Sequence, residues 1–328
     1  MSGGRPAIAV IVVNYGTARL ALSAIESVLA HDPGPREVEI HLVDNASPDG
    51  DAEILATAIA DRQWSGQVTL YRQPENIGFG RANNVVLDRL AKRRAQPELV
   101  FLLNPDARLA NDALRELANF LEDHPSSGAA GARLIDESGA ISTSAFRFPS
   151  IAGEFAEAAS FGPVTRLLRR WRIPMDPERE TGPVDWVTGA AVMLRFGALK
   201  QVSFFDPGFF LYYEEVDLMR RLTRAGWSCW HVAEAEVIHA EGSATKLRGN
   251  EVGLRRRPDY WYESRRLYSY RSRGRVGAIA NGFVALAGAG LNHATSFLRG
   301  KKPWLPERFI QDSWRVILWP LLTGWRPR

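Results

Sequence analysis

Residues 7–13 of the chain read AIAVIVV, and the polar pair Asn14 and Tyr15 follows them directly. An apolar run of seven residues, rich in β-branched side chains, predicts a buried strand. A helical pattern follows over residues 18–30 and a second strand pattern over 39–43. A strand, a helix and a second strand in this order are typical of a parallel βαβ unit.

The same alternation continues towards the middle of the chain. Helical patterns at 52–61, 82–93 and 112–122 alternate with strand patterns at 68–71 and 99–103. We therefore predict an α/β fold with an open, mostly parallel sheet flanked by helices. Residues 142–183 lack clear periodicity and predict loops with one short helix. Order returns at 184–195, then come a helix over 214–225 and two short strands at 227–232 and 236–239.

The composition is that of a globular protein. The chain has 328 residues, of which 45% are hydrophobic and 24% charged, and this balance excludes disordered, collagen-like and small disulfide-stapled proteins. Its single cysteine, Cys229, excludes an intramolecular disulfide, thiolate-rich zinc sites and iron–sulfur clusters.

The charge divides the chain into two regions. Residues 1–245 carry a net charge of −8, whereas residues 246–328 carry +12 and five of the ten tryptophans. We expect the second region to be a basic, aromatic-rich helical extension that meets an anionic partner, either lipid headgroups or nucleic acid. No recognised nucleic-acid-binding motif accompanies the charge, so we expect no nucleic acid partner and favour an anionic membrane surface.

One stretch of this extension is apolar. Residues 276–298 are long enough to cross a bilayer, but Asn281, Asn292 and His293 interrupt them. We expect a helix that lies on the membrane or is partly inserted, rather than one that spans it. Dimerisation of two copies through the apolar side of this helix is the alternative.

Polar residues follow the predicted strands at their carboxyl ends, where open parallel sheets form their sites. Asp44 ends the second strand and can accept hydrogen bonds from a base N–H or a ribose hydroxyl. Asp106 follows the fourth strand after Asn104 and can supply an oxygen ligand to Mg²⁺ or Mn²⁺. Ordinary turns are the alternative in both places.

The segment from Asn76 to Asn84 resembles an anion-binding helix start. Gly78 and Gly80 let a ligand approach the backbone, and Arg81 with the helix N–H groups suits a diphosphate. A plain helix cap is the alternative.

Acidic residues cluster at the start of the helix at 214–225. Glu215 shares a stripe with apolar residues, whereas Glu214 and Asp217 lie on the other side, where Asp217 can pair with Arg221. Burial would raise the pKa of Glu215 and suit it to take a proton, although acids also favour any helix N-terminus. His239 ends the last predicted strand and is a candidate metal ligand or phosphate contact, or a structural histidine.

Taken together and in order, these segments resemble the family 2 glycosyltransferases of the GT-A fold, particularly the bacterial rhamnosyltransferase-like branch that builds polysaccharides and lipid-linked glycans. The resemblance covers residues 8–245, so residues 1–245 are predicted as the catalytic domain and 246–328 as a membrane-associating region. The matching segments are VVNYG at 12–16, VDNASPDG at 43–50, ENIGFGRANN at 75–84, LLNPDA at 102–107, WVTGAAVMLR at 186–195, FFLYYEEVDLMRRL at 209–222 and VIHAEGSAT at 237–245.

The resemblance implies a role for each matching position. Glu215 would be the base that deprotonates the acceptor, with Glu214 and Asp217 as the alternatives, and Asp106 with His239 would bind the divalent cation. The nucleotide sugar would be bound by Asn14, Tyr15, Asp44, Asn76, Gly78, Arg81, Asn84 and Asn104, and the sugar and acceptor pocket would be lined by Trp186, Thr188, Gly189 and Tyr213.

Two positions depart from the family pattern. Asn104 replaces the first acid of the D-x-D element, which leaves fewer charged metal ligands. Glu215 stands where the family usually has an aspartate, so its carboxylate lies one methylene further out, or the base is one of its neighbours.

The implied activity is inverting transfer of rhamnose or a hexose, with Mn²⁺ or Mg²⁺, from a dTDP- or UDP-sugar to a saccharide or lipid-linked acceptor of the cell envelope. The enzyme would be cytoplasmic and peripheral at the inner face of the cell membrane. Two alternatives remain: a nucleotidyltransferase that releases pyrophosphate, and a non-catalytic protein that binds a membrane or nucleic acid.

Overall fold

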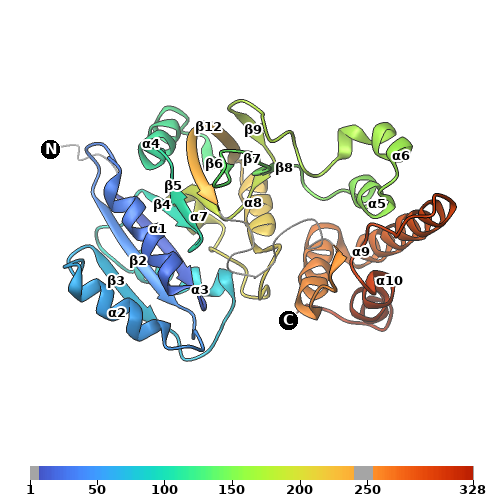
Figure 1. Cartoon of the computed structure of the whole chain (residues 1–328), viewed down its shortest axis with the longest axis horizontal. Helices are drawn as coiled ribbons and strands as arrows, with labels where there is room; N and C mark the ends of the chain where they lie inside the picture. The colour runs from blue at the N-terminus through green and yellow to red at the C-terminus, as the bar shows by residue number, and fades with distance from the viewer. Residues whose placement is uncertain (1–6, 240–253, 328) are drawn as a thin grey trace. The chain divides into compact units, whose positions relative to one another are not determined.

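The computed structural model describes residues 7–239 and 254–327 of the chain. The chain forms two compact units (Figure 1), which we call the sheet unit and the helical unit. The sheet unit contains Met1–Phe146, Asp176–Pro207 and Glu215–Leu247, and the helical unit contains Arg147–Met175, Gly208–Glu214 and Arg248–Arg328.

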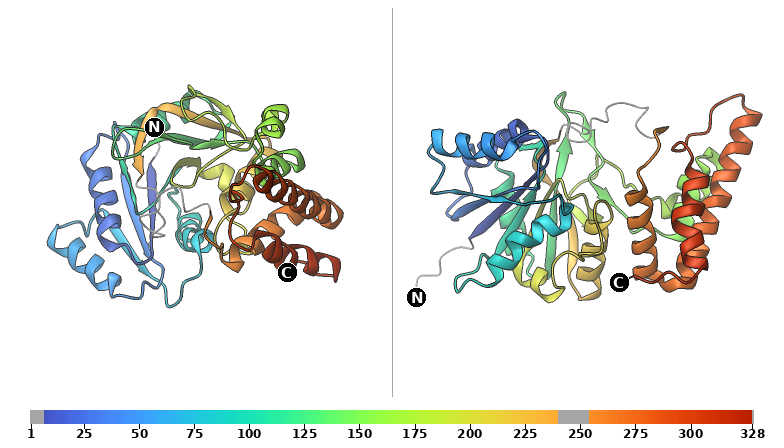
Figure 2. Two further views of the ribbon diagram at one scale, coloured as in Figure 1. Left: turned by 45° about the vertical axis from the view of Figure 1, so that its right-hand side comes forward. Right: turned by 90° about the horizontal axis from the view of Figure 1, so that it is seen from below.

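The first half of the sheet unit has the predicted βαβ pattern. Four parallel strands are arranged in the order β3-β2-β1-β4, with helices α1, α2 and α3 between them in sequence. Every residue of β1 is buried, because α1 and α2 cover one side of these strands and α3 the other (Figure 2). The bounds are β1 Ile8–Asn14, α1 Ala18–Ala30, β2 Val38–Asp44, α2 Asp51–Asp61, β3 Val68–Arg72, α3 Phe79–Ala91 and β4 Leu99–Leu103.

The second half continues the sheet in the order β4-β11-β6-β12-β5, with β7 on β6 and β9 on β12. Strands β6 and β12 run in the direction of β1–β4, so six of the ten strands in the described part of this sheet are parallel and the fold prediction is confirmed. A separate short pair joins β10 to β8. The bounds are β5 Ala107–Leu109, α4 Ala113–Asp123, β6 Ser127–Ile135, β7 Ile141–Ser142, β8 Ala145–Phe146, β9 Gly182–Val184, β10 Trp186–Val187, β11 Ala191–Arg195, α7 Phe196–Gln201, α8 Glu214–Arg224 and β12 Ser228–His239.

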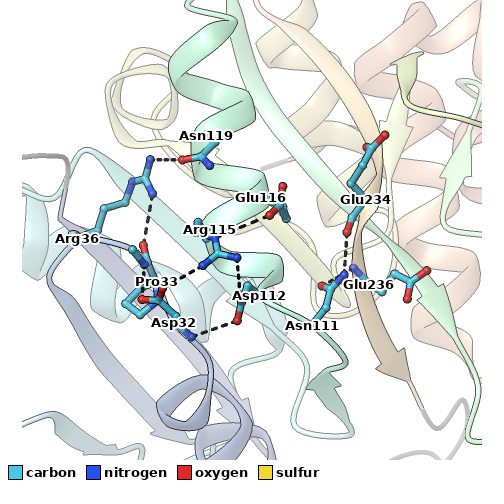
Figure 3. A network of polar contacts seen from close by, with 11 residues as sticks. Asp32, Pro33, Arg36, Asn111, Asp112, Arg115, Glu116, Asn119, Glu234 and Glu236 are labelled. Atoms are coloured by element: carbon cyan, nitrogen blue, oxygen red, sulfur yellow. Dashed lines mark hydrogen bonds and ion pairs between the residues drawn. The ribbon is translucent and has the colours of Figure 1, made fainter.

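Strand β12 differs from the prediction of two short strands, because it is continuous from Ser228 to His239. Its register against β6 shifts between Val232 and Glu236, so residues 233–235 bulge out of the ladder without partners on β6. The side chain of Asn111 binds the bulged backbone on both sides, donating to Glu234 O at 2.8 Å and accepting from Glu236 N at 3.1 Å (Figure 3). These bonds satisfy two of the polar groups that the bulge leaves unpaired, and Thr181 Oγ1 accepts from a third, Ala233 N, at 2.8 Å.

Two arginines attach α4 to the turn that precedes β2. Arg115 donates to Asp32 Oδ2 at 2.9 Å, and the buried Arg36 donates to Asn119 Oδ1 at 2.7 Å (Figure 3). The network is structural, since it fixes α4 against the first half of the sheet.

The helical unit differs from the sequence prediction of loops with one short helix over 142–183. Two α-helices and a 3₁₀ turn form there. The sequence pattern did not indicate α5, because this helix buries mainly alanine and glycine, whose small side chains give a weak periodic signal. The bounds are α5 Ile151–Ala159, α6 Gly162–Leu167, η1 Arg169–Trp171, α9 Asp259–Leu298, α10 Phe309–Asp312, η3 Ser313–Leu318 and α11 Trp319–Leu322.

Helix α9, with 40 residues, is the longest helix in the described part of this unit, and it bends at Gly274, whose φ is 70°. Its second half packs closely: a Cβ on Gly288 would lie 2.7 Å from Phe155 O of α5, and one on Gly282 would lie 2.7 Å from Leu318 Cδ2. In the described part of the chain, α9 is the one helix long and apolar enough to cross a membrane, and a third of its apolar window is buried inside the protein.

Candidate active site

The carboxyl ends of β1 and β2 bring Asn14 and Asp44 together. The two residues are register partners, and Asn14 Nδ2 donates to Asp44 Oδ1 at 3.0 Å. Both side chains are buried, and Asn14 Oδ1 accepts a hydrogen bond from Thr17 N at 3.2 Å. Asp44 also accepts a hydrogen bond from Ser47 Oγ at 2.6 Å. The Asn14 amide is thus turned into the protein, where it orients the Asp44 carboxylate and the start of α1.

Sequence reasoning missed Asp51 in this cluster. Its Oδ2 atom accepts hydrogen bonds from Asn14 Nδ2 and Ala18 N, both at 2.9 Å, and the residue is buried. The carboxylate therefore joins the first residue of α2 to the first residue of α1. The available signal was an acid at the start of a predicted helix, directly after the VDNASPDG segment. Tyr15, by contrast, is 48% exposed, so its ring is free to stack on a base.

The segment from Asn76 to Asn84 binds other parts of the sheet unit. Asn76 Oδ1 accepts from Asn45 Nδ2 at 2.9 Å and from Gly78 N at 3.0 Å. Asn84 donates to Phe205 O at 2.8 Å and accepts from Phe205 N at 3.1 Å, while Arg81 Nε donates to Pro207 O at 2.7 Å. The polar side chains of Arg81 and Asn84 therefore hold residues 205–207 against the first half of α3.

Asp106 and His239 meet because β5 pairs with β12, which places His239 opposite Ala107. His239 Nε2 lies 3.2 Å from Asp106 Oδ1, and both side chains are largely buried. Asp106 also borders a small, open cavity of about 40 Å³ between α1 and β5.

This pair fits a divalent cation. His239 Nδ1 is buried and has no hydrogen-bond partner among the described residues, and a carboxylate with an imidazole is a donor set that Mn²⁺ accepts. In the described ranges, no group of three or more His, Cys, Asp or Glu side chains is arranged to hold a metal, so Asp106 and His239 are the two candidate ligands of this kind there.

The three acids at the start of α8 have different surroundings. Glu214 and Asp217 are buried, and Asp217 Oδ2 accepts from Arg221 Nε at 2.7 Å, which confirms the predicted pair. Glu215 is partly exposed, although its Oε2 atom is buried and has no hydrogen-bond partner in the described parts of the chain. Burial raises the pKa of the Glu215 carboxyl group. Both neighbours are thus more buried than Glu215, contrary to the predicted outer face.

The turn before β11 lies beside Glu215. A Cβ on Gly189 would be 4.0 Å from Glu215 Cβ and 3.6 Å from Phe79 Cε1, so the backbone at Gly189 is close to both. The neighbouring Ala190 O accepts from Asn104 N at 2.8 Å, which links this turn to the loop that carries Asp106. The Gly189 turn therefore adjoins the start of α8 and is bonded to the end of β4.

Two more residues of the predicted sugar and acceptor pocket lie on the approach to this turn. Trp186 stacks on Phe146 with ring centroids 4.2 Å apart, and Thr188 N donates to Ser144 O at 3.1 Å. Tyr213 belongs to the helical unit, where its ring lies 5.5 Å from that of Tyr268.

The order of the strands, with acids at the carboxyl end of β2, just after β4 and at the start of α8, is that of the GT-A fold. Solved structures share this fold: the mannosyltransferase PcManGT from Pyrobaculum calidifontis, in complex with GDP-Man and Mn²⁺, has a TM-score of 0.55 and 16% identity over 97% of this chain and 86% of that one. TarS 1–349 from S. aureus, in complex with UDP-GlcNAc, has a TM-score of 0.54 and 14% identity over 90% of this chain and 76% of that one.

The chain belongs to glycosyl transferase family 2. Its family model matches residues 9–179, and the model of glycosyl transferase family group 2 matches 99–324, well beyond residue 245 where the recognised motifs end. The chain is 32% identical to N-acetylglucosaminyl-diphospho-decaprenol L-rhamnosyltransferase of Mycobacterium tuberculosis over 221 residues, 64% of this chain and 69% of the relative. It is 26% identical to rhamnosyltransferase WbbL of Escherichia coli over 164 residues, 49% of this chain and 60% of the relative.

Family membership decides between the enzymatic alternatives. The chain is a glycosyltransferase similar to rhamnosyltransferases, so the nucleotidyltransferase interpretation is set aside.

Proposed function

We propose that the protein transfers a sugar, with inversion, from a nucleotide diphosphate to an acceptor hydroxyl, and that Glu215 is the base. The acceptor oxygen attacks the anomeric carbon, the bond from that carbon to the diphosphate oxygen breaks, and the acceptor proton passes to Glu215. The observation that carries the proposal is the position of Glu215 beside the Gly189 turn: the residue is partly exposed, its Oε2 atom is buried without a hydrogen-bond partner in the described residues, and burial raises the pKa of its carboxyl group.

The neighbouring acids are less suited to this role. Asp217 is paired with the guanidinium of Arg221, which stabilises the charged carboxylate and weakens it as a base. Glu214 and Asp217 are both buried, whereas Glu215 is accessible in part. A base must reach the acceptor hydroxyl within hydrogen-bonding distance, so accessibility favours Glu215.

Asp106 and His239 would hold Mn²⁺ or Mg²⁺, with the remaining ligands coming from the donor diphosphate. The bound cation would offset the negative charge that develops on the leaving group. The chain itself would hold the nucleotide through the Asp44 carboxylate, oriented by Asn14, and through the exposed ring of Tyr15.

For the donor and acceptor we propose an activated rhamnose, such as dTDP-rhamnose, and a lipid-linked saccharide of the cell envelope. Support comes from the names of the relatives, one of which transfers L-rhamnose to N-acetylglucosaminyl-diphospho-decaprenol. UDP-hexoses are the competing donors on this fold, and the assay below includes them.

We also propose that the helical unit attaches the enzyme to the inner, cytoplasmic face of the cell membrane. Ten of the twelve large apolar side chains that are exposed in the described residues belong to this unit. Three of the four on α9 belong to an exposed stripe with spacings of four and three residues and no polar member. The stripe consists of Val276, Ala280, Phe283, Ala287, Gly290, Ala294 and Phe297.

Charge and packing indicate how α9 would meet the membrane. Residues 264–306 contain no acid, and arginines and lysines lie on both sides of 276–298, as an anionic lipid surface requires. The opposite face of α9 packs on α5 and η3 through Gly288 and Gly282, so only one side of the helix is open to lipid. We therefore propose a helix that lies on the membrane rather than one that spans it.

The enzymatic proposal is tested by nucleoside diphosphate release from a panel of UDP-, GDP- and dTDP-sugars with membrane lipid extract as acceptor source. Each donor is tried with Mn²⁺, Mg²⁺ or chelator, on the wild type, Glu215→Gln and Asp217→Asn. We expect release from one donor, loss of release with chelator, and a fall of at least about a hundredfold in kcat for Glu215→Gln, since general base catalysis contributes about 10²–10⁴-fold.

The variants separate the candidate bases. We expect Asp217→Asn to keep most of the transfer and to lower Tm, because it breaks the pair with Arg221. Transfer that survives Glu215→Gln would move the base to a neighbour, and release that is unaffected by chelator would remove the cation from the proposal.

A further inference from the structure

The segment that leads into α8 and the proposed base Glu215, which follows it directly, belong to different units. Residues Gly208–Glu214 are part of the helical unit, and the sheet unit resumes at Glu215. Because α8 begins at Glu214, the boundary falls within its first turn. The conformation of this segment therefore sets the direction in which the chain enters the helix that carries Glu215.

The backbone of this segment is strained immediately before the helix. Tyr212 and Tyr213 have φ values of 70° and 68°, so two consecutive residues with bulky side chains adopt the left-handed conformation. L-amino acids other than glycine avoid this region because Cβ crowds the following carbonyl oxygen. Such a conformation persists only when surrounding contacts hold it.

The contacts that hold it come from the first half of α9. Ser264, which is buried, donates through Oγ to Leu211 O at 2.9 Å. The ring of Tyr260 stacks on that of Tyr212 at 6.2 Å and an interplanar angle of 17°, and meets Phe210 edge-on at 5.5 Å. Residues 260 and 264 are four apart and lie on one face of α9. One face of this helix thus holds both the backbone and the side chains of the strained segment.

We propose that Ser264 and Tyr260 are positioning residues for the transfer reaction: by holding the strained Tyr212–Tyr213 backbone, they place the Glu215 carboxylate for proton removal. The proposal rests on the proposed role of Glu215 as base. Without these contacts the two tyrosines relax to ordinary backbone conformations, and the first turn of α8 changes direction. A displacement of about 1 Å at a reacting group costs on the order of 100-fold in rate.

The chain offers matched controls on the same helix. Ser264→Ala is compared with Ser296→Ala, since both serines are buried and each donates one hydrogen bond, Ser296 to Asn292 Oδ1 at 3.1 Å. Tyr260→Leu is compared with Tyr270→Leu, since both tyrosines are half-buried, and Tyr270 contacts the ring of Trp325 at 5.7 Å instead of the strained segment.

Two measurements on the full-length protein test the proposal. In the release assay, we expect Ser264→Ala and Tyr260→Leu to lower kcat at least tenfold with the donor KM changed less than twofold, and both controls to keep kcat within twofold. In hydrogen exchange, we expect the amides of residues 216–218 to exchange faster in Ser264→Ala than in the wild type or Ser296→Ala.

The outcomes distinguish this proposal from the proposed function. Unchanged exchange at 216–218 in Ser264→Ala, or kcat losses of the same size in the controls, would overturn the positioning role. A fall in kcat accompanied by an equal rise in donor KM would also overturn it, because that pattern indicates general loss of the fold. If the wild type releases no nucleoside diphosphate, the proposed function fails, while the exchange comparison still tests the positioning.

Discussion

The side chains of the candidate site fall into two groups: some bind other parts of the protein, and others are accessible or border a cavity. Asn14, Asp51 and Asn84 have their polar atoms bound to other parts of the protein, although two of them were predicted to contact the nucleotide sugar. Tyr15 and Glu215 are accessible, and Asp106 borders a cavity. We infer that the first group acts by orienting the second, so that substitutions in the two groups will have different effects on stability and activity.

Asp51 provides the residue-scale test. In Asp51→Ala, the buried Ala18 N loses this acceptor and the Asn14 amide keeps only its bonds to Asp44 and Ser47, so we expect the free energy of unfolding to fall by about 2 kcal/mol. The donor KM should rise as well, because the Asn14 amide, which orients Asp44, loses one of the bonds that fix it. Thermal unfolding and the release assay measure the two effects. Asp61→Ala, at the exposed end of α2, is the control, and equal destabilisation by both variants would contradict the role of Asp51.

At the scale of the elements, glycines allow two helices to pack closely against their neighbours. At the start of α3, a Cβ on Gly80 would lie 3.1 Å from Phe205 Cβ, so the glycine permits close packing of the chain that Asn84 and Arg81 hold. The glycine-rich motif thus has a packing role beside any contact with a diphosphate. In the helical unit, Gly288 has the corresponding role between α9 and α5.

A pair of glycines on α9 tests this packing. A Cβ on Gly288 would be 2.7 Å from Phe155 O, whereas one on Gly290 would meet no atom within 4 Å. We expect Gly290→Ala to raise the free energy of unfolding by up to about 1 kcal/mol through helix propensity. Gly288→Ala should lower it by about 1–3 kcal/mol, because α9 must move away from α5. Chemical denaturation measures both, and an equal gain in the two variants would contradict the close packing.

Elements with strong periodicity could be predicted, and those without it could not. Helix α1 and strand β4 match their predicted ranges, and β1 to β3 differ from theirs by one residue at one or both ends, because buried parallel strands and amphipathic helices give clear patterns. Helix α5 was missed because its buried face is mostly alanine and glycine. The continuity of β12 was missed because Asn111, more than 100 positions away in sequence, satisfies its bulge.

The chain as a whole combines an acidic region, residues 1–245, with a basic one, residues 246–328. The excess of positive charge at 246–328 and the exposed stripe of α9 occur in the same unit. A basic surface with exposed aromatic side chains matches the chemistry of an anionic bilayer, at about 1 kcal/mol for each basic residue near the surface.

Liposome flotation tests this attachment. We expect the protein to float with anionic vesicles and not with zwitterionic ones, and to be released by high salt. The double variant Phe283→Ser and Phe297→Ser should bind at least tenfold more weakly, while Ile54→Ser, which changes an exposed residue of the sheet unit, should bind as the wild type does. A protein that fails to bind and sediments as a dimer, which the double variant converts to a monomer, would assign the stripe to dimerisation instead.

Residue order by itself determined the fold class and the family, because strand and helix periodicity and the spacing of short motifs are local properties of the chain. The tertiary structure alone decided which polar groups are already satisfied within the protein. Asp51 joins Asn14, Asn84 binds Phe205, and Ser264 holds Leu211 across 53 positions of sequence. Such pairings depend on distance in space and on burial, which a linear pattern does not contain.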